Sequence, residues 1–248
     1  MKKLIVAASM LALCFSVSAQ DYKPVAGDVT AEIGANVVNT GLSGSPFSAV
    51  NTNFPNNGLL RFRYFIADKT ALRLGFNGSV FSRTVTGTTG VIDYKQTYKS
   101  SLLGLNLGIE KHFNGTERLS TYIGADLLFN FLGASSKGEH INLGGAVADN
   151  NGYKVKGTNG LGTASTGDDI NSAFGFGLRA VTGADYYFAE KAYIGIEMGI
   201  GFISYKNGKQ KTENTTTGTT TTTDLSSTGS SFELTPAASA AFRLGYRF

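Results

Sequence analysis

The feature that most constrains the fold is a two-residue period in hydrophobicity, which recurs in eight segments of the chain. In the clearest one, every second residue from Ala192 to Phe202 is apolar, and tyrosine, glycine or glutamate stands between them. A period of two places alternate side chains on opposite faces of a β-strand. The other seven segments are residues 29–37, 60–66, 72–80, 103–109, 119–131, 174–183 and 232–248. The sequence therefore predicts eight strands, each with one apolar face.

The connections between these segments alternate strictly between short and long. The short ones are residues 67–70, 112–118 and 188–191, and the long ones lie near residues 39–58, 82–99, 133–169 and 204–231. A soluble β-sandwich has no reason to alternate loop length, whereas transmembrane β-barrels have short periplasmic turns and long extracellular loops. Strands of about ten residues span a bilayer, and a sheet in lipid must close on itself. We expect an all-β fold, a closed antiparallel transmembrane β-barrel of eight strands over residues 20–248.

Residues 1–19 have the pattern of a cleaved secretory signal peptide. Two lysines precede an apolar run at residues 4–13, and a Val-Ser-Ala cleavage site ends at Ala19. The run is too short for a transmembrane helix, which needs about 20 residues. We expect the mature chain to begin at Gln20. A lipoprotein with Cys14 as the lipidated residue is the alternative, although the residue before it is leucine rather than a small one.

The composition excludes several classes of function. Cys14 is the only cysteine, so a mature chain beginning at Gln20 has no disulfide, thiol nucleophile or cysteine metal ligand. Charged residues make up 16% of the chain, against about 25% in soluble domains. Loss of two leader lysines leaves 20 of the 22 basic residues against 18 acidic ones, a net charge of +2. This balance gives no basis for a nucleic-acid partner, and we expect no cofactor and no metal site.

The faces opposite the apolar ones carry five acidic and five basic residues. These are Glu32, Glu110, Asp126, Glu197 and Glu233 with Arg61, Arg63, Arg73, Arg179 and Arg243. The interior of an eight-stranded barrel is just wide enough for side chains to fill, and a lone buried ion costs several kcal/mol. We predict that the ten residues pair in a network that seals the interior. The alternative is a narrow passive channel for small solutes, with room left by inward-facing glycines.

Aromatic residues gather where interface girdles are expected, at the two ends of the strands. At the short-connection end they are Tyr64, Phe65, Phe113, Tyr122, Tyr186, Tyr187, Phe188, Tyr193, Tyr246 and Phe248, and at the other end Phe81, Phe129, Phe131, Phe174, Phe202 and Phe232. Pro236 interrupts the last segment. Because proline cannot donate to a strand ladder, we expect it at the outer rim of the barrel.

The two histidines are the candidates for chemistry. His112 lies beside a short connection, where we expect it at the membrane interface. His140 lies in the third long loop with Ser135, Glu139 and Asp168 along the same loop, so a loop-borne hydrolase is an alternative function. No spacing among these residues matches a recognised catalytic motif. A catalytic triad is defined by the geometry of its side chains, which sequence separation does not give.

The fourth long loop is rich in threonine and serine, with a threonine run over residues 215–223. Polar low-complexity sequence cannot bury a core, so the loop is expected to be mobile at its tip. It is either a solvated spacer or an exposed segment that is glycosylated or antigenically variable.

Two stretches carry a family resemblance, namely Phe242-Arg243-Leu244-Gly245-Tyr246-Arg247-Phe248 and Gly183-Ala184-Asp185-Tyr186-Tyr187-Phe188. In them the chain resembles the small outer-membrane β-barrel superfamily, of the OmpX, OmpA membrane-domain and Bacteroidetes "porin family" type. The resemblance implies an outer-membrane location with both termini periplasmic and the long loops extracellular. It also implies that Phe242, Leu244, Tyr246 and Phe248 form the signal read by the barrel assembly machinery.

The expected function is a non-enzymatic structural or interaction role in the outer membrane. The expected partners are outer-membrane lipid, the assembly machinery during biogenesis, and other outer-membrane proteins or host surface ligands that bind the long loops. The passive channel and the loop-borne hydrolase are the alternatives.

Overall fold

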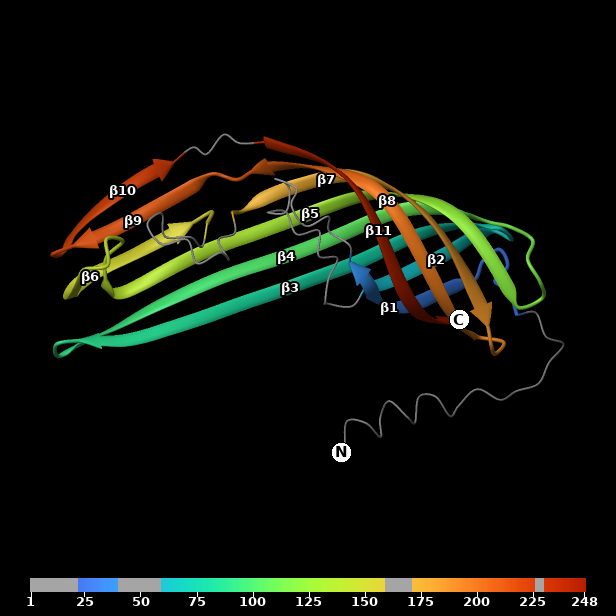
Figure 1. Ribbon diagram of the computed structural model, residues 1–248, viewed down its shortest axis with the longest axis horizontal. Helices are drawn as coiled ribbons and strands as arrows, with labels where there is room; N and C mark the ends of the chain where they lie inside the picture. The colour runs from blue at the N-terminus through green and yellow to red at the C-terminus, as the bar shows by residue number, and fades with distance from the viewer. Residues whose placement is uncertain (1–21, 40–58, 159–170, 226–229) are drawn as a thin grey trace, which may run out of the picture.

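Eight antiparallel strands close into a barrel in the computed structural model, which describes residues 22–39, 59–158, 171–225 and 230–248. In chain order the barrel strands are β1 (Val29–Asn39), β2 (Leu59–Ala67), β3 (Thr70–Thr89), β4 (Ile92–His112), β5 (Leu119–Ile141), β7 (Ala173–Tyr187), β8 (Ala192–Asn207) and β11 (Ser230–Arg247). Pairing of β5 with β7 and of β1 with β11 closes the ring (Figure 1). The predicted fold class is confirmed. Among the described residues, no helix has the length and apolar character needed to cross a membrane.

Three further strands lengthen the sheet beyond one end of the barrel. They are β6 (Val147–Lys156), β9 (Gln210–Thr216) and β10 (Thr219–Leu225). β6 pairs with the far part of β5, β9 pairs with β6, and β10 pairs with β9. With the far halves of β3, β4 and β5 they form an extension that projects from the barrel rim (Figure 1). It has a small core of its own, in which Ile141, Tyr153 and Val155 are buried.

The structure differs from the sequence prediction in the segments expected to be long loops. Residues 82–99 belong to one continuous β3–β4 hairpin, whose two-residue turn is Gly90-Val91. The threonine run is also ordered as a β9–β10 hairpin, because β-branched side chains suit a pleated strand. Residues 40–58, 159–170 and 226–229, and the predicted leader, lie outside the described residues.

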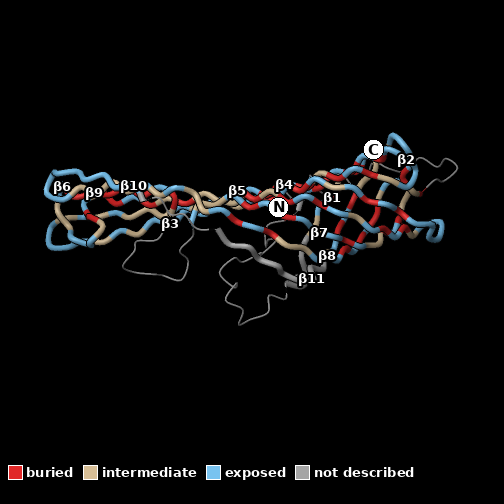
Figure 2. Tube along the Cα trace, turned by 90° about the horizontal axis from the view of Figure 1, so that it is seen from above, coloured by how far each residue is buried: buried red, intermediate tan, exposed pale blue. Residues whose placement is uncertain are grey.

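The apolar faces of the barrel strands point outward. Ile33, Ile196 and Ile200 have exposed fractions of 61%, 52% and 57%, while their strand neighbours Glu32 and Glu197 are buried. Apolar surface this continuous is costly in water but suits contact with acyl chains. The polar positions of the same strands face the interior, and Figure 2 shows the buried residues alternating with exposed ones along the strands.

Inward-facing glycines make room for tyrosine rings on the neighbouring strand. In five cross-strand pairs, a Cβ on the glycine would overlap the ring of the tyrosine beside it. The pairs are Gly245 with Tyr193, Gly183 with Tyr122, Gly175 with Tyr205, Gly138 with Tyr153, and Gly87 with Tyr94. The high glycine content therefore reflects ring packing across the strands as well as turns.

Part of the predicted aromatic girdle is wrong, because four of its members lie inside the barrel. Phe65, Tyr122, Tyr187 and Tyr193 are all buried. Each of them lies an even number of residues from a buried charged residue on its own strand, as Phe65 does from Arg63 and Tyr193 from Glu197. The two-residue period of the strand therefore decides which side they face. Tyr64, Phe113, Tyr186, Phe188 and Phe248 are exposed, in keeping with a girdle.

A short segment before β1 covers the end of the barrel where the short turns lie. Tyr22 packs on Tyr187 and Tyr193, and its hydroxyl accepts a 2.7 Å hydrogen bond from Arg118. Arg247 donates to the carbonyl of Lys23 at 2.7 Å. Farther along β11, the β11–β8 ladder is irregular between Thr235 and Ser239, where Pro236 cannot donate, and it continues beyond this point to Ser230.

Candidate functional site

Five arginines and five carboxylates form one ion-pair network inside the barrel. Arg61 binds Glu197 in a bidentate pair with both distances 2.8 Å. Arg73 contacts Glu197 at 2.9 Å, Glu110 at 3.1 Å and Asp126 at 2.8 Å. Bidentate and charge-assisted hydrogen bonds are the strong ones, so the network fixes its members in place.

The remaining arginines complete the network and balance its charge. Arg63 contacts Glu32 at 3.1 Å and Glu110 at 2.8 Å. Arg243 contacts Glu32 at 2.6 Å, and half-buried Arg179 binds Asp126 at 2.6 Å. The same number of positive and negative groups compensates the cost of burying each charge.

Several of these contacts cross the full width of the barrel. In the ring of eight strands, β2 lies opposite β7, and β3 lies opposite β8. Arg63 on β2 nevertheless contacts Asp185 on β7 at 2.8 Å, and Arg73 on β3 contacts Glu197 on β8 at 2.9 Å. The side chains from opposite walls therefore meet in the middle of the bore.

Sequence reasoning missed one central member of the network and included one that the structure does not test. Asp185 is fully buried and joins Arg63 to Arg243, with distances of 2.8 and 2.7 Å. Asp185 lies six residues after Arg179 on β7, so the two-residue period of the strand puts both side chains on the inward face. Glu233 pairs with Ile203 along the β11–β8 ladder, but its side chain lies outside the described residues.

His112 is buried inside the barrel, and the expectation of an interface position is wrong. Its Nδ1 lies 2.8 Å from Ser120 Oγ and its Nε2 lies 2.9 Å from Glu110 Oε1. This serine–histidine–glutamate chain has the residue types of a hydrolase triad. However, Ser120 is only 3% exposed, and Glu110 is already held by Arg63 and Arg73. In the described residues, Ser120 and His112 are thus both buried, and the chain of contacts ends at a carboxylate that belongs to the ion-pair network.

His140 lies at an irregularity of β5 in the extension, with a positive φ of 60°. Its Nδ1 is 2.8 Å from the carbonyl oxygen of Asp149, while Glu139 is paired with Lys137 at 2.6 Å. Ser135 and Ser136 alternate between the two faces of β5, and Asp168 lies outside the described residues. The described side chains do not bring a serine, His140 and an acid together, and no cluster of metal-ligating residues occurs among them.

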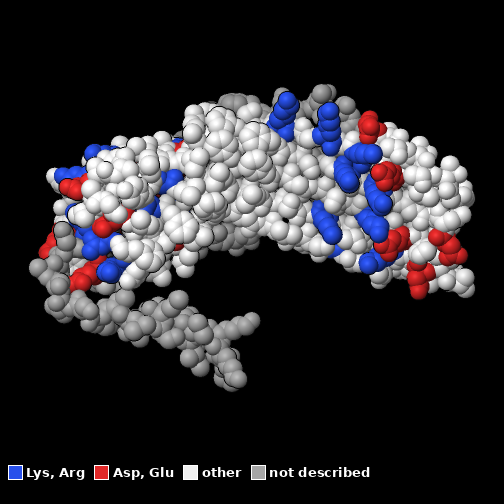
Figure 3. Space-filling view, turned by 180° about the vertical axis from the view of Figure 1, so that it is seen from behind, with Lys and Arg blue, Asp and Glu red and all other residues white. Residues whose placement is uncertain are grey.

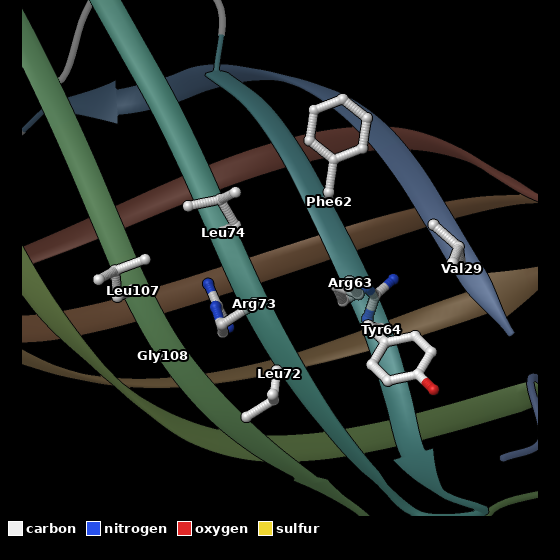
Figure 4. Close-up of a pocket in the computed structure, with 9 residues that line it drawn as sticks. All are labelled: Val29, Phe62, Arg63, Tyr64, Leu72, Arg73, Leu74, Leu107 and Gly108. Carbon is white, nitrogen blue, oxygen red and sulfur yellow. The ribbon is translucent and has the colours of Figure 1, made fainter. Parts of the chain in front are cut away.

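A shallow hollow of about 380 Å³ lies on the outer, apolar face of the barrel rather than inside it. Figure 4 shows its lining, in which Phe62, Tyr64, Leu72, Leu74 and Leu107 come from β2, β3 and β4. Arg63 and Arg73 also line it, but their guanidinium groups bind acids inside the barrel. The rest of the lining is apolar and faces the same way as the outer surface, so we call the hollow the apolar furrow.

A closed eight-stranded barrel with an apolar exterior and a charged interior defines an outer-membrane β-barrel protein. The putative OmpA-OmpF-like porin family matches residues 51–248, and the chain belongs to that family.

Solved structures of bacterial outer-membrane proteins are also similar. The N-terminal β-barrel domain of Pseudomonas aeruginosa OprF is 11% identical with a TM-score of 0.36, over 91% of this chain and all of that one. Pseudomonas aeruginosa OprG is 15% identical with a TM-score of 0.43, over 92% and 98%. The attachment invasion locus protein Ail of Yersinia pestis is 13% identical with a TM-score of 0.31, over 90% and 99%. No curated protein matches significantly. The TM-scores are below 0.5, so nothing about function follows from these similarities.

Proposed function

We propose that this protein is a non-enzymatic, non-conducting barrel that anchors a projecting β-sheet in the outer membrane for binding to partners. The observation that carries the proposal is the network that crosses the bore, above all the Arg63–Asp185 and Arg73–Glu197 pairs between opposite walls. Toward the short turns, the rings of Tyr187 and Tyr193 pack at an angle of 45° with their centroids 5.1 Å apart, and Tyr22 packs on them. Ions would have to separate several buried ion pairs to pass.

The extension supports the interaction role. It doubles the length of β3, β4 and β5 relative to what a bilayer requires, since about 9–11 residues span it and these strands have 20, 21 and 23 residues. In the proposed orientation the short turns and both termini are periplasmic and the extension is extracellular. The partners are other outer-membrane proteins or ligands at a host surface, and outer-membrane lipid surrounds the barrel. Folding would use the assembly machinery, which would read Phe242, Leu244, Tyr246 and Phe248.

Planar-bilayer conductance of the purified protein tests the sealed interior. We expect no stable openings from the wild type, and openings from a variant that removes both pairs between opposite walls (Arg63→Ala, Asp185→Ala, Arg73→Ala and Glu197→Ala together). A matched control with Lys137→Ala and Glu139→Ala, an exposed pair in the extension, should behave as the wild type. Large, stable, voltage-insensitive openings from the wild type would overturn the proposal.

The passive channel is the second candidate, and one observation favours it. Asn77, Asn106 and Asn130 face the interior toward the extension, and buried amide atoms of each have no protein partner. Buried amides of this kind are normally solvated by water. The interior on that side is therefore lined by polar groups that water would solvate, and conduction would require the network and the Tyr22, Tyr187 and Tyr193 cluster to rearrange.

A further inference from the structure

The outer face of the extension carries a band of lysines whose positions follow from the strand register. Lys99 on β4 pairs with Ser135 on β5, Ser135 pairs with Lys156 on β6, and Lys156 pairs with Lys211 on β9. In the next row toward the tip, Lys137 on β5 pairs with Lys154 on β6. Paired residues project from the same face of a sheet. Five lysines from four strands therefore lie together, and we call them the lysine band.

The lysine band lies directly beyond the apolar belt of the barrel. On the outward face of β4, Leu107 and Leu103 are exposed, and Lys99 lies four residues before Leu103, on the side of the extension. At about 3.3 Å per residue, Lys99 lies roughly 13 Å past the last apolar side chain, within reach of headgroups through its long stem. Figure 3 shows the same order over the surface, with an uncharged zone, then a gathering of basic residues, then acidic residues farther toward the tip.

Acidic side chains neutralise only part of the lysine band. The ammonium of Lys137 donates a hydrogen bond to Glu139, which holds the pKa of that carboxyl below its usual range. Lys211 lies 3.6 Å from Glu213. Lys99, Lys154 and Lys156 are exposed, and among the described residues no carboxylate lies within 4 Å of them. Glu213 is nevertheless the cross-strand neighbour of Lys154 on the same face. Lys99 and Lys156, which flank Ser135, are therefore fully available where the membrane surface begins, and Lys154 is available in part.

We propose that the lysine band binds phosphate-bearing headgroups of the lipids in the leaflet around the extension. In the orientation of the proposed function, on which this inference rests, that leaflet is the outer one. Lysine is a suitable ligand for phosphate as a point charge, and a basic residue near an anionic membrane surface strengthens binding by about fivefold. Glu213 and Asp224 border the band on the β9 and β10 side, so the attraction is strongest at Lys99 and Lys156. The apolar furrow on the barrel wall would receive the acyl chains of lipids held nearby.

Lipid binding by the full mature protein in mild detergent tests the proposal. The probes are diphosphorylated lipid A, the same lipid with both phosphates removed, and inorganic phosphate, each titrated by calorimetry. The test variant carries Lys99→Gln, Lys154→Gln and Lys156→Gln. The matched control carries Lys69→Gln, Lys111→Gln and Lys191→Gln, which removes three exposed lysines at the opposite end of the barrel.

We expect the wild type and the control to bind the diphosphorylated lipid alike, and the test variant to bind it roughly a hundredfold more weakly. Affinity should fall as salt rises. Equal binding by the test variant, or equal affinity of the wild type for the dephosphorylated lipid, would overturn the proposal. Inorganic phosphate bound as tightly as the lipid would also overturn it, because the site would then serve a free anion. Bilayer conductance of the same preparations tests the sealed barrel separately from lipid affinity. Failure of the proposed function would appear as channel openings, and failure of the lipid-binding proposal would appear as unchanged lipid affinity of the test variant.

Discussion

At the scale of single residues, the interior depends on carboxylates that each serve more than one arginine. Glu197 accepts hydrogen bonds from Arg61 and Arg73, and the Tyr122 hydroxyl donates to it at 2.7 Å. Loss of Glu197 would leave Arg61 with only the 3.6 Å contact to Glu32 and would remove one of the three acidic partners of Arg73. Replacement of a whole buried network by apolar residues can be neutral, whereas removal of one partner is strongly destabilising.

The substitution Glu197→Gln should therefore lower the free energy of unfolding by roughly 3–5 kcal/mol, because Arg61 loses its bidentate partner and Arg73 loses one of its three acids, and both arginines are less than 5% exposed. Urea unfolding of the protein in lipid vesicles measures it. The control is Glu139→Gln, at an exposed ion pair, which should leave the unfolding midpoint unchanged. Similar midpoints for the two variants would show that the network does not hold the barrel together.

Prediction from sequence succeeded for residues whose side of the barrel wall follows from the two-residue period of the strand. The alternation predicted an inward face for Arg61 and Arg73, and the structure brings them together. It failed where a residue was assigned by type, as with Tyr193, which was expected at the interface because it is aromatic. Asp185 was overlooked because it stood in a motif that was interpreted as a family signature. The pairing of arginines with acids across the bore depends on the order of the strands around the barrel. The two-residue period of a single strand carries no information about that order.

At the scale of elements, the extension shows what local pattern cannot predict. β6 pairs with β9, which lies more than 50 residues later in the chain. The threonine run of β9 and β10 has no apolar alternation, so nothing in it marks a strand. Its order comes from β-branched side chains together with the partner strand beside it, whereas the low-complexity composition indicated a mobile tip.

The β9–β10 turn offers a test at this scale. Thr217 and Gly218 both have positive φ, 49° and 80°, which is the pattern of a type I′ turn. Threonine is strained there and asparagine is not, so Thr217→Asn should stabilise the hairpin by about 0.5–1 kcal/mol. Hydrogen exchange of the β9 and β10 amides should slow by a few fold. Gly218→Ala, one residue away, should speed it, and the same change in both variants would argue against this turn geometry.

At the scale of the whole molecule, the surface is divided along the long axis. Charged groups occupy both ends, an uncharged belt lies between them, and the lysine band borders the belt on the extension side (Figure 3). The belt limits the membrane to one position along the barrel. The direction of insertion is a separate question, because an apolar belt is the same from either side.

Cysteine labelling in whole cells tests the direction of insertion. Val91, at the tip of the β3–β4 hairpin, is 97% exposed, and Lys191 is exposed in the short β7–β8 turn at the opposite end. Cys14 is the only native cysteine and lies in the predicted leader, so an introduced thiol would be the only one in the mature chain. With an extracellular extension, Val91→Cys should react with a membrane-impermeant maleimide in intact cells, and Lys191→Cys only after the outer membrane is permeabilised. The reverse pattern would place the lysine band against the inner leaflet, where its lipid partner would be a phospholipid instead.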